Sequence, residues 1–318
     1  MYKLNPCNIK MHEHQPLIID IKGNSLDDGP GVRSVIFVKG CPLRCVWCQN
    51  PESKHVKQEI FYDQSQCIGC GDCITHCSEK ALTLVNGKIL FDHAKCTACM
   101  ACVSSCEPKA ISAVGANLSI DDIMAKILPY QPFFDNTGGG VTITGGEATL
   151  FMPFISSLLK TLKKHNIHTL LETCGMFNFK RFETLILPYL DTVYVDMKIV
   201  DKEDHINYCG QSNERILENI QKLHQRSKKG SFTLLTRTPL IPNITDTDKN
   251  IMQICEFYQQ VGIKKAAILK NNPLWMDKAK HLGVKLDLPQ QARQFYREEK
   301  FTHIQKLFND KGIHIVSM

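Results

Sequence analysis

The sequence predicts an α/β protein: an open, partial (β/α)6 barrel that is interrupted near its start by a small cysteine-rich domain. Two observations predict this fold. Strand-like apolar segments alternate with helix-length amphipathic segments over most of the 318 residues, and eleven of the 15 cysteines fall into three tight groups. About six strand–helix units are fewer than the eight of a closed barrel, so we expect the sheet to stay open.

The expected strands are short runs rich in apolar and β-branched residues, at 32–38, 141–144, 169–172, 192–196, 232–237 and 266–270. The helices expected between them run 151–165, 179–190, 214–225 and 248–260. A further helix opens at Ser119, with Asp122 three residues on, as in a capping box. Repeated units of this kind form a parallel sheet, whose strands carry catalytic residues at their carboxyl ends.

The interruption divides the chain into three segments. Residues 1–54 begin the barrel and carry the first cysteine group, residues 55–112 form the insert, and residues 113–318 complete the barrel and add a C-terminal segment. Within the insert, the run TLVNGKIL predicts a short hairpin that turns at Asn86 and Gly87.

Composition excludes several classes of protein. Hydrophobic residues make up 43% and charged residues 22% of the chain, which is ordinary for a globular protein. The net charge of +6 is scattered without a basic run, so we expect no nucleic-acid binding. Apolar runs are strand-sized and the N-terminus lacks an apolar signal core, so we expect no membrane span and a cytoplasmic location.

The cysteine spacing indicates metal centres. The three groups are Cys41, Cys45 and Cys48; Cys67, Cys70, Cys73 and Cys77; and Cys96, Cys99, Cys102 and Cys106. Thiols two or three residues apart can converge on one soft-metal centre, whereas several neighbouring disulfides at this spacing would be strained. Iron–sulfur clusters are the leading interpretation, and structural zinc is the alternative.

The second and third groups form an internal repeat of C-x2-C-x2-C-x3-C, offset by 29 residues. The repeat resembles the two-cluster bacterial ferredoxins, although the usual proline after the fourth cysteine is displaced to Pro108 in the second run and is missing from the first. In those proteins the fourth cysteine of each run ligates the other cluster. The resemblance thus implies one [4Fe–4S] cluster on Cys67, Cys70, Cys73 and Cys106, and another on Cys96, Cys99, Cys102 and Cys77.

The first group, C-x3-C-x2-C, directly follows the first predicted strand. Three thiolates can hold three irons of a [4Fe–4S] cluster and leave the fourth iron open to a substrate, as an open position marks a catalytic zinc. The alternative is a fourth ligand from Cys7, Cys174, Cys209 or Cys255, which otherwise are expected to be small core residues.

Several motifs together resemble the radical S-adenosylmethionine (SAM) superfamily, and within it the glycyl radical enzyme activating enzymes that carry a two-cluster insert. Besides C-x3-C-x2-C, they are DGPGVR at 28–33, WCQNP at 47–51, GGGVTITGGE at 138–147, LETCG at 171–175, DMK at 196–198, YCGQSN at 208–213 and RTPLIP at 237–242. The resemblance covers residues 17–275 and implies a partial barrel of the radical SAM type with a ferredoxin-like insert.

The resemblance also implies an activity. Such an enzyme cleaves SAM reductively to a 5′-deoxyadenosyl radical, which abstracts a hydrogen from one glycine of a partner glycyl radical enzyme. The implied cofactors are three [4Fe–4S] clusters and SAM. The implied partners are that cognate enzyme and an electron donor such as flavodoxin or ferredoxin, and we expect the chain to be monomeric.

The resemblance assigns roles to individual residues. Cys41, Cys45 and Cys48 hold the catalytic cluster. The SAM contacts are Trp47, Cys48, Gln49, Gly145, Gly146, Glu147, Asp196, Met197 and Lys198. Some relatives add a late histidine contact, for which Asn250 is the nearest polar candidate here. A monovalent cation is implied on Glu172, Thr173 and Asp196. Taken without the family, Asp196 and Lys198 read better as a surface ion pair, and Arg33 and Arg237 as paired framework residues.

Three other functions fit parts of the pattern. A radical SAM enzyme with another substrate needs only the three-cysteine motif. A non-catalytic electron-transfer protein would hold three clusters without binding SAM, and a zinc-stabilised interaction protein would be colourless. For the insert, electron delivery is expected, with a purely structural role as the alternative.

Overall fold

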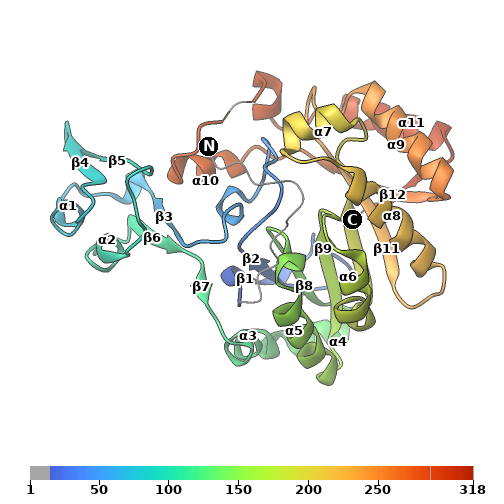
Figure 1. Ribbon diagram of the computed structural model, residues 1–318, viewed down its shortest axis with the longest axis horizontal. Helices are drawn as coiled ribbons and strands as arrows, with labels where there is room; N and C mark the ends of the chain where they lie inside the picture. Colours follow the sequence, from blue (N-terminus) through green and yellow to red (C-terminus); the bar gives the residue numbers. More distant parts are fainter. Residues whose placement is uncertain (1–14, 287, 318) are drawn as a thin grey trace.

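The structure is a computed structural model that describes residues 15–286 and 288–317. Figure 1 shows a curved sheet with helices along its outer side and a small lobe that projects away from it. In the described part of the chain the main sheet has nine strands, in the order β13-β12-β11-β10-β9-β8-β2-β1-β7. The α/β fold class and the open, partial barrel are therefore confirmed.

Six consecutive strands of this sheet run parallel to one another. They are β2 (Arg33–Val38), β8 (Gly140–Gly145), β9 (His168–Thr173), β10 (Thr192–Asp196), β11 (Thr233–Leu240) and β12 (Lys265–Lys270). Each overlaps a strand predicted from the sequence, and β2 and β11 begin one residue later than predicted. Because they run in one direction, their carboxyl ends meet at one end of the barrel, where the segments that follow them form the candidate site.

Three further strands lie outside the predicted set. At one side β1 (Leu17–Ser25) pairs antiparallel with β2, and β7 (Ala116–Asn117) pairs with β1. At the other side β13 (His314–Ile315) is parallel to β12. In β1, exposed polar residues alternate with apolar ones, as expected of a strand near the sheet edge. The two ends of the strand order leave the barrel open on one side.

The predicted helices are present, and others accompany them. α3 (Ile120–Ile127) starts at the predicted capping box, and α5 (Met152–Lys164), α6 (Phe179–Leu185), α8 (Glu214–Ser227) and α9 (Asp248–Val261) follow their strands. α6 ends before the predicted residue 190, where Pro188 lies in a separate 3-10 turn (Leu187–Tyr189). The additional helices are α4 (Gln131–Thr137), α7 (Lys202–Cys209), α10 (Trp275–His281) and α11 (Glu298–Asp310). The remaining 3-10 turns are Pro51–Ser53 (η1), Gln64–Gln66, Leu128–Tyr130, Ala148–Phe151 and Gln290–Arg293.

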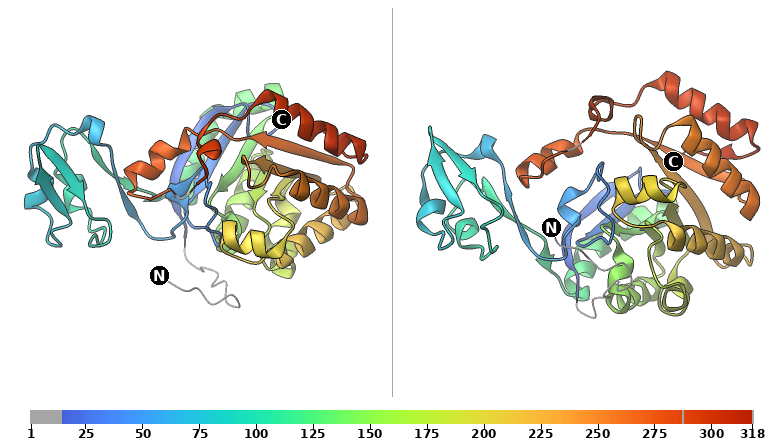
Figure 2. Two further views of the ribbon diagram at one scale, coloured as in Figure 1. Left: turned by 90° about the horizontal axis from the view of Figure 1, so that it is seen from above. Right: turned by 45° about the horizontal axis from the view of Figure 1, so that its top comes forward.

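The insert forms the projecting lobe of Figure 1. Its stem is the antiparallel pair β3 (Glu59–Tyr62) and β6 (Ile111–Val114). Beyond the stem lie the one-turn helices α1 (Asp72–Thr75) and α2 (Ala101–Ser104) and the predicted hairpin, β4 (Leu82–Val85) and β5 (Lys88–Phe91). Figure 2 shows that the lobe stands apart from the barrel and that α10 lies between the two.

The internal repeat predicted from the cysteines extends to the backbone. Gly69, Gly71 and Lys80 have positive φ angles, and so do Ala98, Met100 and Lys109, each 29 residues further on. The insert also has its own small apolar core, in which Ile60, Leu82, Ile89 and Ile111 pack around Cys73 and Cys102. A separate and larger core fills the space between the barrel sheet and its helices.

Within the described residues, the helices are all too short or too polar to cross a membrane.

Candidate active site

The loop that carries Cys41, Cys45 and Cys48 leaves the carboxyl end of β2 and is held from two sides. On one side Gly40 N donates a hydrogen bond to Ser53 O (2.7 Å), in the turn that follows the loop. On the other side Arg44 N donates to the carbonyl of the last residue of α7 (2.7 Å). The loop is thereby fixed at the barrel end where the parallel strands terminate.

The thiols of this loop are largely shielded from solvent. Cys45 is buried, and Cys41 and Cys48 are partly buried. Burial raises the pKa of Cys48 to about 12, whereas a hydrogen bond from Cys209 outweighs burial and lowers the pKa of Cys45 to about 7. A neighbouring positive charge stabilises a shielded thiolate. Irons bound to the three sulfurs would supply that charge, so the loop fits an iron–sulfur cluster.

Gly146, which follows β8, lies directly against this loop. A Cβ atom added at Gly146 would stand 2.1 Å from Gly40 O and 2.9 Å from Ser53 O, both of which are backbone atoms. Glu147 N also donates to Gly40 O (2.7 Å). Glycine is therefore required at 146 because the two backbones touch there.

We expect Gly146→Ala to displace the cluster loop, because neither backbone atom can move aside without moving the loop. The variant should lose about 3 kcal/mol of stability and the iron of one cluster, as measured by the thermal midpoint and iron content of anaerobically purified protein. The matched control is Gly138→Ala, where φ is +67° but no described atom lies within 4 Å of the added Cβ. That variant should lose only about 1 kcal/mol and no iron. Equal losses in the two variants would contradict the close-approach argument.

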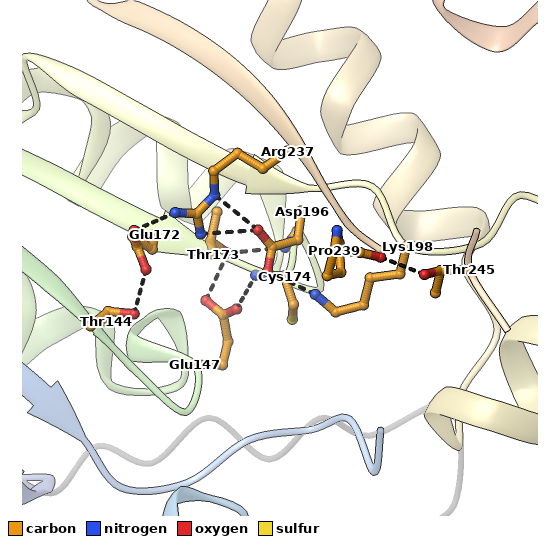
Figure 3. A network of polar contacts seen from close by, with 11 residues as sticks. Thr144, Glu147, Glu172, Thr173, Cys174, Asp196, Lys198, Arg237, Pro239 and Thr245 are labelled. Atoms are coloured by element: carbon orange, nitrogen blue, oxygen red, sulfur yellow. Dashed lines mark hydrogen bonds and ion pairs between the residues drawn. The ribbon is translucent and has the colours of Figure 1, made fainter. Parts of the chain in front are cut away.

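Glu147 lies fully buried and joins β8 to the end of β9 (Figure 3). Its Oε1 accepts hydrogen bonds from the hydroxyls of Thr149 (2.6 Å) and Thr173 (2.8 Å), and its Oε2 accepts one from Cys174 N (2.7 Å). The carboxylate is thus already occupied by neighbouring donors. The contact of Glu147 with the SAM ammonium stays a prediction. Its hydrogen bonds to Thr173 and Cys174 fix the end of β8 relative to the end of β9.

Four charged side chains form a network across the inner face of the barrel (Figure 3). Asp196 accepts hydrogen bonds from Lys198 Nζ (2.8 Å) and from Arg237 Nη2 (3.0 Å). Arg237 also donates to Glu172, whose other oxygen accepts a hydrogen bond from Thr144 Oγ1 (2.8 Å). The network joins β8, β9, β10 and β11 close to their carboxyl ends.

The network is shielded from solvent, so its charges interact strongly. The Arg237 side chain is 7% exposed, and those of Asp196 and Lys198 are 22% and 10% exposed. Burial alone would raise the pKa of Asp196, but Lys198 and Arg237 hold it below its ordinary value. Burial would likewise lower the pKa of Lys198, yet Asp196 and the neighbouring thiols keep it raised. The interpretation of Asp196 and Lys198 as a plain surface pair is therefore wrong.

Arg237 is a buried, paired framework residue, as its reading without the family predicted, but its partners were not predicted. The sequence showed only an arginine before Thr-Pro, and its partners Glu172 and Asp196 come from other strands, so their convergence needed the register of the sheet. The predicted cation on Glu172, Thr173 and Asp196 stays a prediction. In the described structure the guanidinium already lies between the two carboxylates, and the Thr173 hydroxyl is used by Glu147.

Asn250, the predicted late SAM contact, lies buried near the start of α9. Its Nδ2 donates to Lys198 O (3.0 Å) and Thr245 O (2.8 Å), and its Oδ1 accepts from Val200 N (3.1 Å). The amide therefore fixes the backbone that follows β10. A direct contact with SAM would require breaking these bonds, and it stays a prediction.

Of the other predicted SAM contacts, Trp47 and Met197 are buried, at 4% and 1% exposure. Gly145 ends β8 beside Gly146. Gln49, on the way out of the cluster loop, is exposed. The structure thus brings together residues from β2, β8 and β10, as the motifs implied.

In the insert, each predicted set of four cysteines lines one hollow. Cys67, Cys70, Cys73 and Cys106 line one hollow. Cys77, Cys96, Cys99 and Cys102 line a second one. Each hollow thus takes its fourth cysteine from the other run, and this is the crossed arrangement that the sequence repeat implied.

Backbone N–H groups point at the sulfurs of the insert. Ala81 N donates to Cys77 Sγ (3.3 Å), Ala98 N to Cys96 Sγ (3.3 Å) and Ile111 N to Cys106 Sγ (3.4 Å). Such donors stabilise the negative charge on cluster sulfurs and so influence reduction potential. Across the described residues, no three His, Cys, Asp or Glu side chains are close enough to hold a single metal ion.

The remaining cysteines occupy different places. Cys174 and Cys209 are buried beside Cys41 and Cys45 respectively, and Cys255 is buried in α9. Cys7 lies outside the described residues. The expectation of small core residues fits all three described cysteines, and Cys174 and Cys209 also form part of the surroundings of the cluster loop.

Two family models match the chain. The model of the radical SAM superfamily matches residues 93–255, and that of a 4Fe-4S dicluster domain matches residues 59–107. The dicluster match includes all eight cysteines of the insert. The superfamily match begins after Cys41, Cys45 and Cys48, so their assignment depends on their spacing and their position after β2.

Curated relatives match most of the chain. It is 35% identical to the trans-4-hydroxy-L-proline dehydratase activating enzyme of Clostridioides difficile, over 92% of this chain and 96% of the relative. It is 34% identical to the indoleacetate decarboxylase activating enzyme of Tractidigestivibacter scatoligenes, over 86% and 88%. It is 37% identical to the benzylsuccinate synthase activating enzyme of Thauera aromatica, over 80% and 76%.

Proposed function

This chain belongs to the radical SAM enzymes that activate glycyl radical enzymes, and from that premise we propose how its residues share the work. The chain is an oxidoreductase with an iron–sulfur centre and SAM as cofactors, and it acts on a cognate glycyl radical enzyme. A bound cluster supplies the electron that breaks the C5′–S bond of SAM, and the resulting 5′-deoxyadenosyl radical takes a hydrogen atom from a glycine of the partner.

Cys41, Cys45 and Cys48 hold the catalytic cluster. Their loop follows the first parallel strand and is fixed by backbone hydrogen bonds from both sides, so the three sulfurs are presented in a constant geometry. Three protein ligands leave one iron open to the amine and carboxylate of SAM. This loop, placed against Gly146 and the charged network, is the observation that carries the proposal.

The segments after β2, β8 and β10 hold SAM. Trp47, Cys48 and Gln49 lie beside its adenine, and Gly145, Gly146 and Glu147 face its ammonium group. Asp196, Met197 and Lys198 contact it from β10. Buried Trp47 and Met197 exclude water from the place where the radical forms, and this protects the radical from side reactions.

The insert holds two further [4Fe–4S] clusters, on the two crossed sets of cysteines, and relays electrons from a flavodoxin or ferredoxin to the catalytic cluster. Exposed Cys70 and Cys99 bring each insert cluster close to the surface, where a donor can approach. The enzyme acts as a monomer in the cytoplasm.

The three-cluster proposal predicts the iron content. Fully reconstituted protein should contain about twelve irons per chain, because each [4Fe–4S] cluster holds four. Iron and zinc are measured together by elemental analysis after anaerobic reconstitution. A plateau near eight irons, or stoichiometric zinc, would remove one cluster from the proposal.

The activity itself is tested with the partner. The names of the three relatives specify three different partners: a dehydratase, a decarboxylase and a synthase. Because the partners differ, the partner of this chain is best identified by anaerobic co-purification. Incubation of both proteins with SAM and a reductant should give a persistent glycyl radical on the partner, detected by EPR. A partner that stays EPR-silent while 5′-deoxyadenosine accumulates would contradict the proposed substrate.

A further inference from the structure

A buried lysine connects the insert to the catalytic loop. Lys39 directly follows β2, two residues before Cys41, and its side chain is fully buried. Its Nζ donates a hydrogen bond to Glu52 O (2.6 Å) in the turn after the cluster loop. The same Nζ forms an ion pair with Glu59, the first residue of β3 and thus of the insert's stem.

Both strands of the stem meet this lysine. Glu59 begins β3, and Gly115 directly follows β6. A Cβ atom added at Gly115 would lie 3.1 Å from Lys39 Cδ, so the backbone at Gly115 packs on the aliphatic part of the lysine side chain. Gln58 Nε2 donates to Gly115 O (2.8 Å) and ties the two ends of the insert together. Lys39 therefore lies where the two strands of the stem join the barrel.

The other side of Lys39 is continuous with the catalytic loop. Cys41 N donates to Lys54 O (3.2 Å), and Gly40 N donates to Ser53 O. Residues 39–41 thus bind residues 52–54 through successive hydrogen bonds, and residues 52–54 lead into the stem. A rotation of the stem would be transmitted through this segment to the loop that carries the catalytic cysteines.

Burying a charged side chain at this position costs free energy. A buried ammonium must be compensated by partners, and apolar residues of similar volume often stabilise a protein as well as a buried ion pair does. An ion pair, however, specifies one geometry between its two elements, which apolar packing does not. The insert is also fastened elsewhere, since Phe61 of β3 packs edge-on against His281 of α10 (4.6 Å between ring centres). Lys39 is therefore better suited to orienting the lobe than to keeping it attached.

We propose that Lys39 is a positioning residue that fixes the orientation of the two-cluster insert relative to the Cys41–Cys48 loop, and so governs electron passage between them. This inference rests on the proposed three-cluster function. Each SAM cleaved consumes one electron, so a fully reduced chain stores electrons for three cleavages, one in the catalytic cluster and two in the insert.

The test compares Lys39→Met with wild-type holoenzyme and with His55→Gln. His55 also binds the Glu59 carboxylate (2.7 Å) but lies on the exposed side of the pair, so its loss leaves the lysine contact intact. Each protein is reconstituted, its iron content is checked, it is photoreduced, the reductant is removed, and SAM is added with the partner. The equivalents of 5′-deoxyadenosine formed are then followed over time.

Wild type and His55→Gln should form up to three equivalents. Lys39→Met should form the first equivalent at the wild-type rate and the later two about tenfold more slowly. The EPR spectrum of the reduced variant, without SAM, should show weaker magnetic interaction between the catalytic cluster and the insert clusters. If Lys39→Met fails to take up iron, Glu59→Gln, which removes only the charge of the partner, replaces it with the same expected results.

Unchanged later equivalents together with unchanged magnetic interaction would overturn the inference. Loss of the first equivalent would also overturn it, because Lys39 would then act on the catalytic site itself. A wild-type enzyme that stops at one equivalent would exclude electron passage but leave the activating function intact. A wild type that forms no 5′-deoxyadenosine would contradict the function itself.

Discussion

Cys45→Ala should abolish SAM cleavage and retain about eight of the twelve irons, those of the two insert clusters. The reason is that, in the proposed arrangement of three clusters, only the three-cysteine cluster would have an open iron, and Cys45 is the most buried of its proposed ligands. The insert has its own core and its own cysteines, so it should keep its clusters. The measurements are 5′-deoxyadenosine formation under reducing conditions and iron content.

The matched control is Cys70→Ala, in the insert. This exposed residue lines a hollow whose lining consists of insert residues, so SAM should still bind and change the EPR signal of the reduced catalytic cluster. Activation should be slower because one relay cluster is damaged. Normal 5′-deoxyadenosine formation by Cys45→Ala would exclude this loop as the catalytic centre.

Arg237→Met should lower the stability of the barrel by about 3 kcal/mol, which corresponds to a thermal midpoint on the order of 5 °C lower. The substitution leaves Glu172 and Asp196, whose side chains are 13% and 22% exposed, without the guanidinium between them. Removing one partner of a shielded ion pair costs much more than removing an exposed one, because the remaining charge is poorly hydrated. SAM binding should fall as well, since Asp196 loses its fixed position.

The stability lost in Arg237→Met should also depend on pH. The pKa of Asp196 is held low despite burial, by Lys198 and Arg237. Such a carboxylate adds stability above its unfolded pKa of about 3.9, and that stability is lost as the pH falls through the folded pKa. The difference in the free energy of unfolding between wild type and Arg237→Met should therefore be largest near pH 7 and should decrease below about pH 4.

Arg226→Met provides the comparison. Arg226 pairs with Glu183 on the surface, with side chains 42% and 37% exposed, so the stability loss should be at most about 1 kcal/mol. Thermal unfolding midpoints over a pH series give both results. A difference for Arg237→Met that grows toward acid pH would contradict the assigned network.

Much of the fold followed from local patterns. The parallel strands β2, β8 and β10 are buried on both faces and so have runs of mostly apolar residues. The helix α3 was readable from Ser119 and Asp122, whose side chains form the cap. By contrast β1 has few consecutive apolar residues, and α11 follows the last predicted strand, where no further strand–helix unit indicated a helix.

In the candidate site, too, some features follow from local sequence patterns and others do not. Cysteine spacing is local, and the resemblance to two-cluster ferredoxins that rests on it implied the same crossed sets that line the two hollows. The pairing of Arg237 with Glu172 and Asp196 depends on three strands in register, and the contact of Lys39 with Glu59 depends on how the insert leaves the barrel. Neither follows from residue type or spacing, because long-range pairing is set by the packed sheet.

The most direct measurement follows the hydrogen that moves. The cognate partner is prepared with α-deuterated glycine and incubated with this enzyme, SAM and a reductant, and the 5′-deoxyadenosine formed is analysed by mass spectrometry. The open side of the barrel gives a partner loop access to bound SAM, so deuterium should appear in 5′-deoxyadenosine in step with the glycyl radical on the partner. Unlabelled 5′-deoxyadenosine beside an activated partner would mean that the hydrogen comes from elsewhere, and this would contradict the activating mechanism.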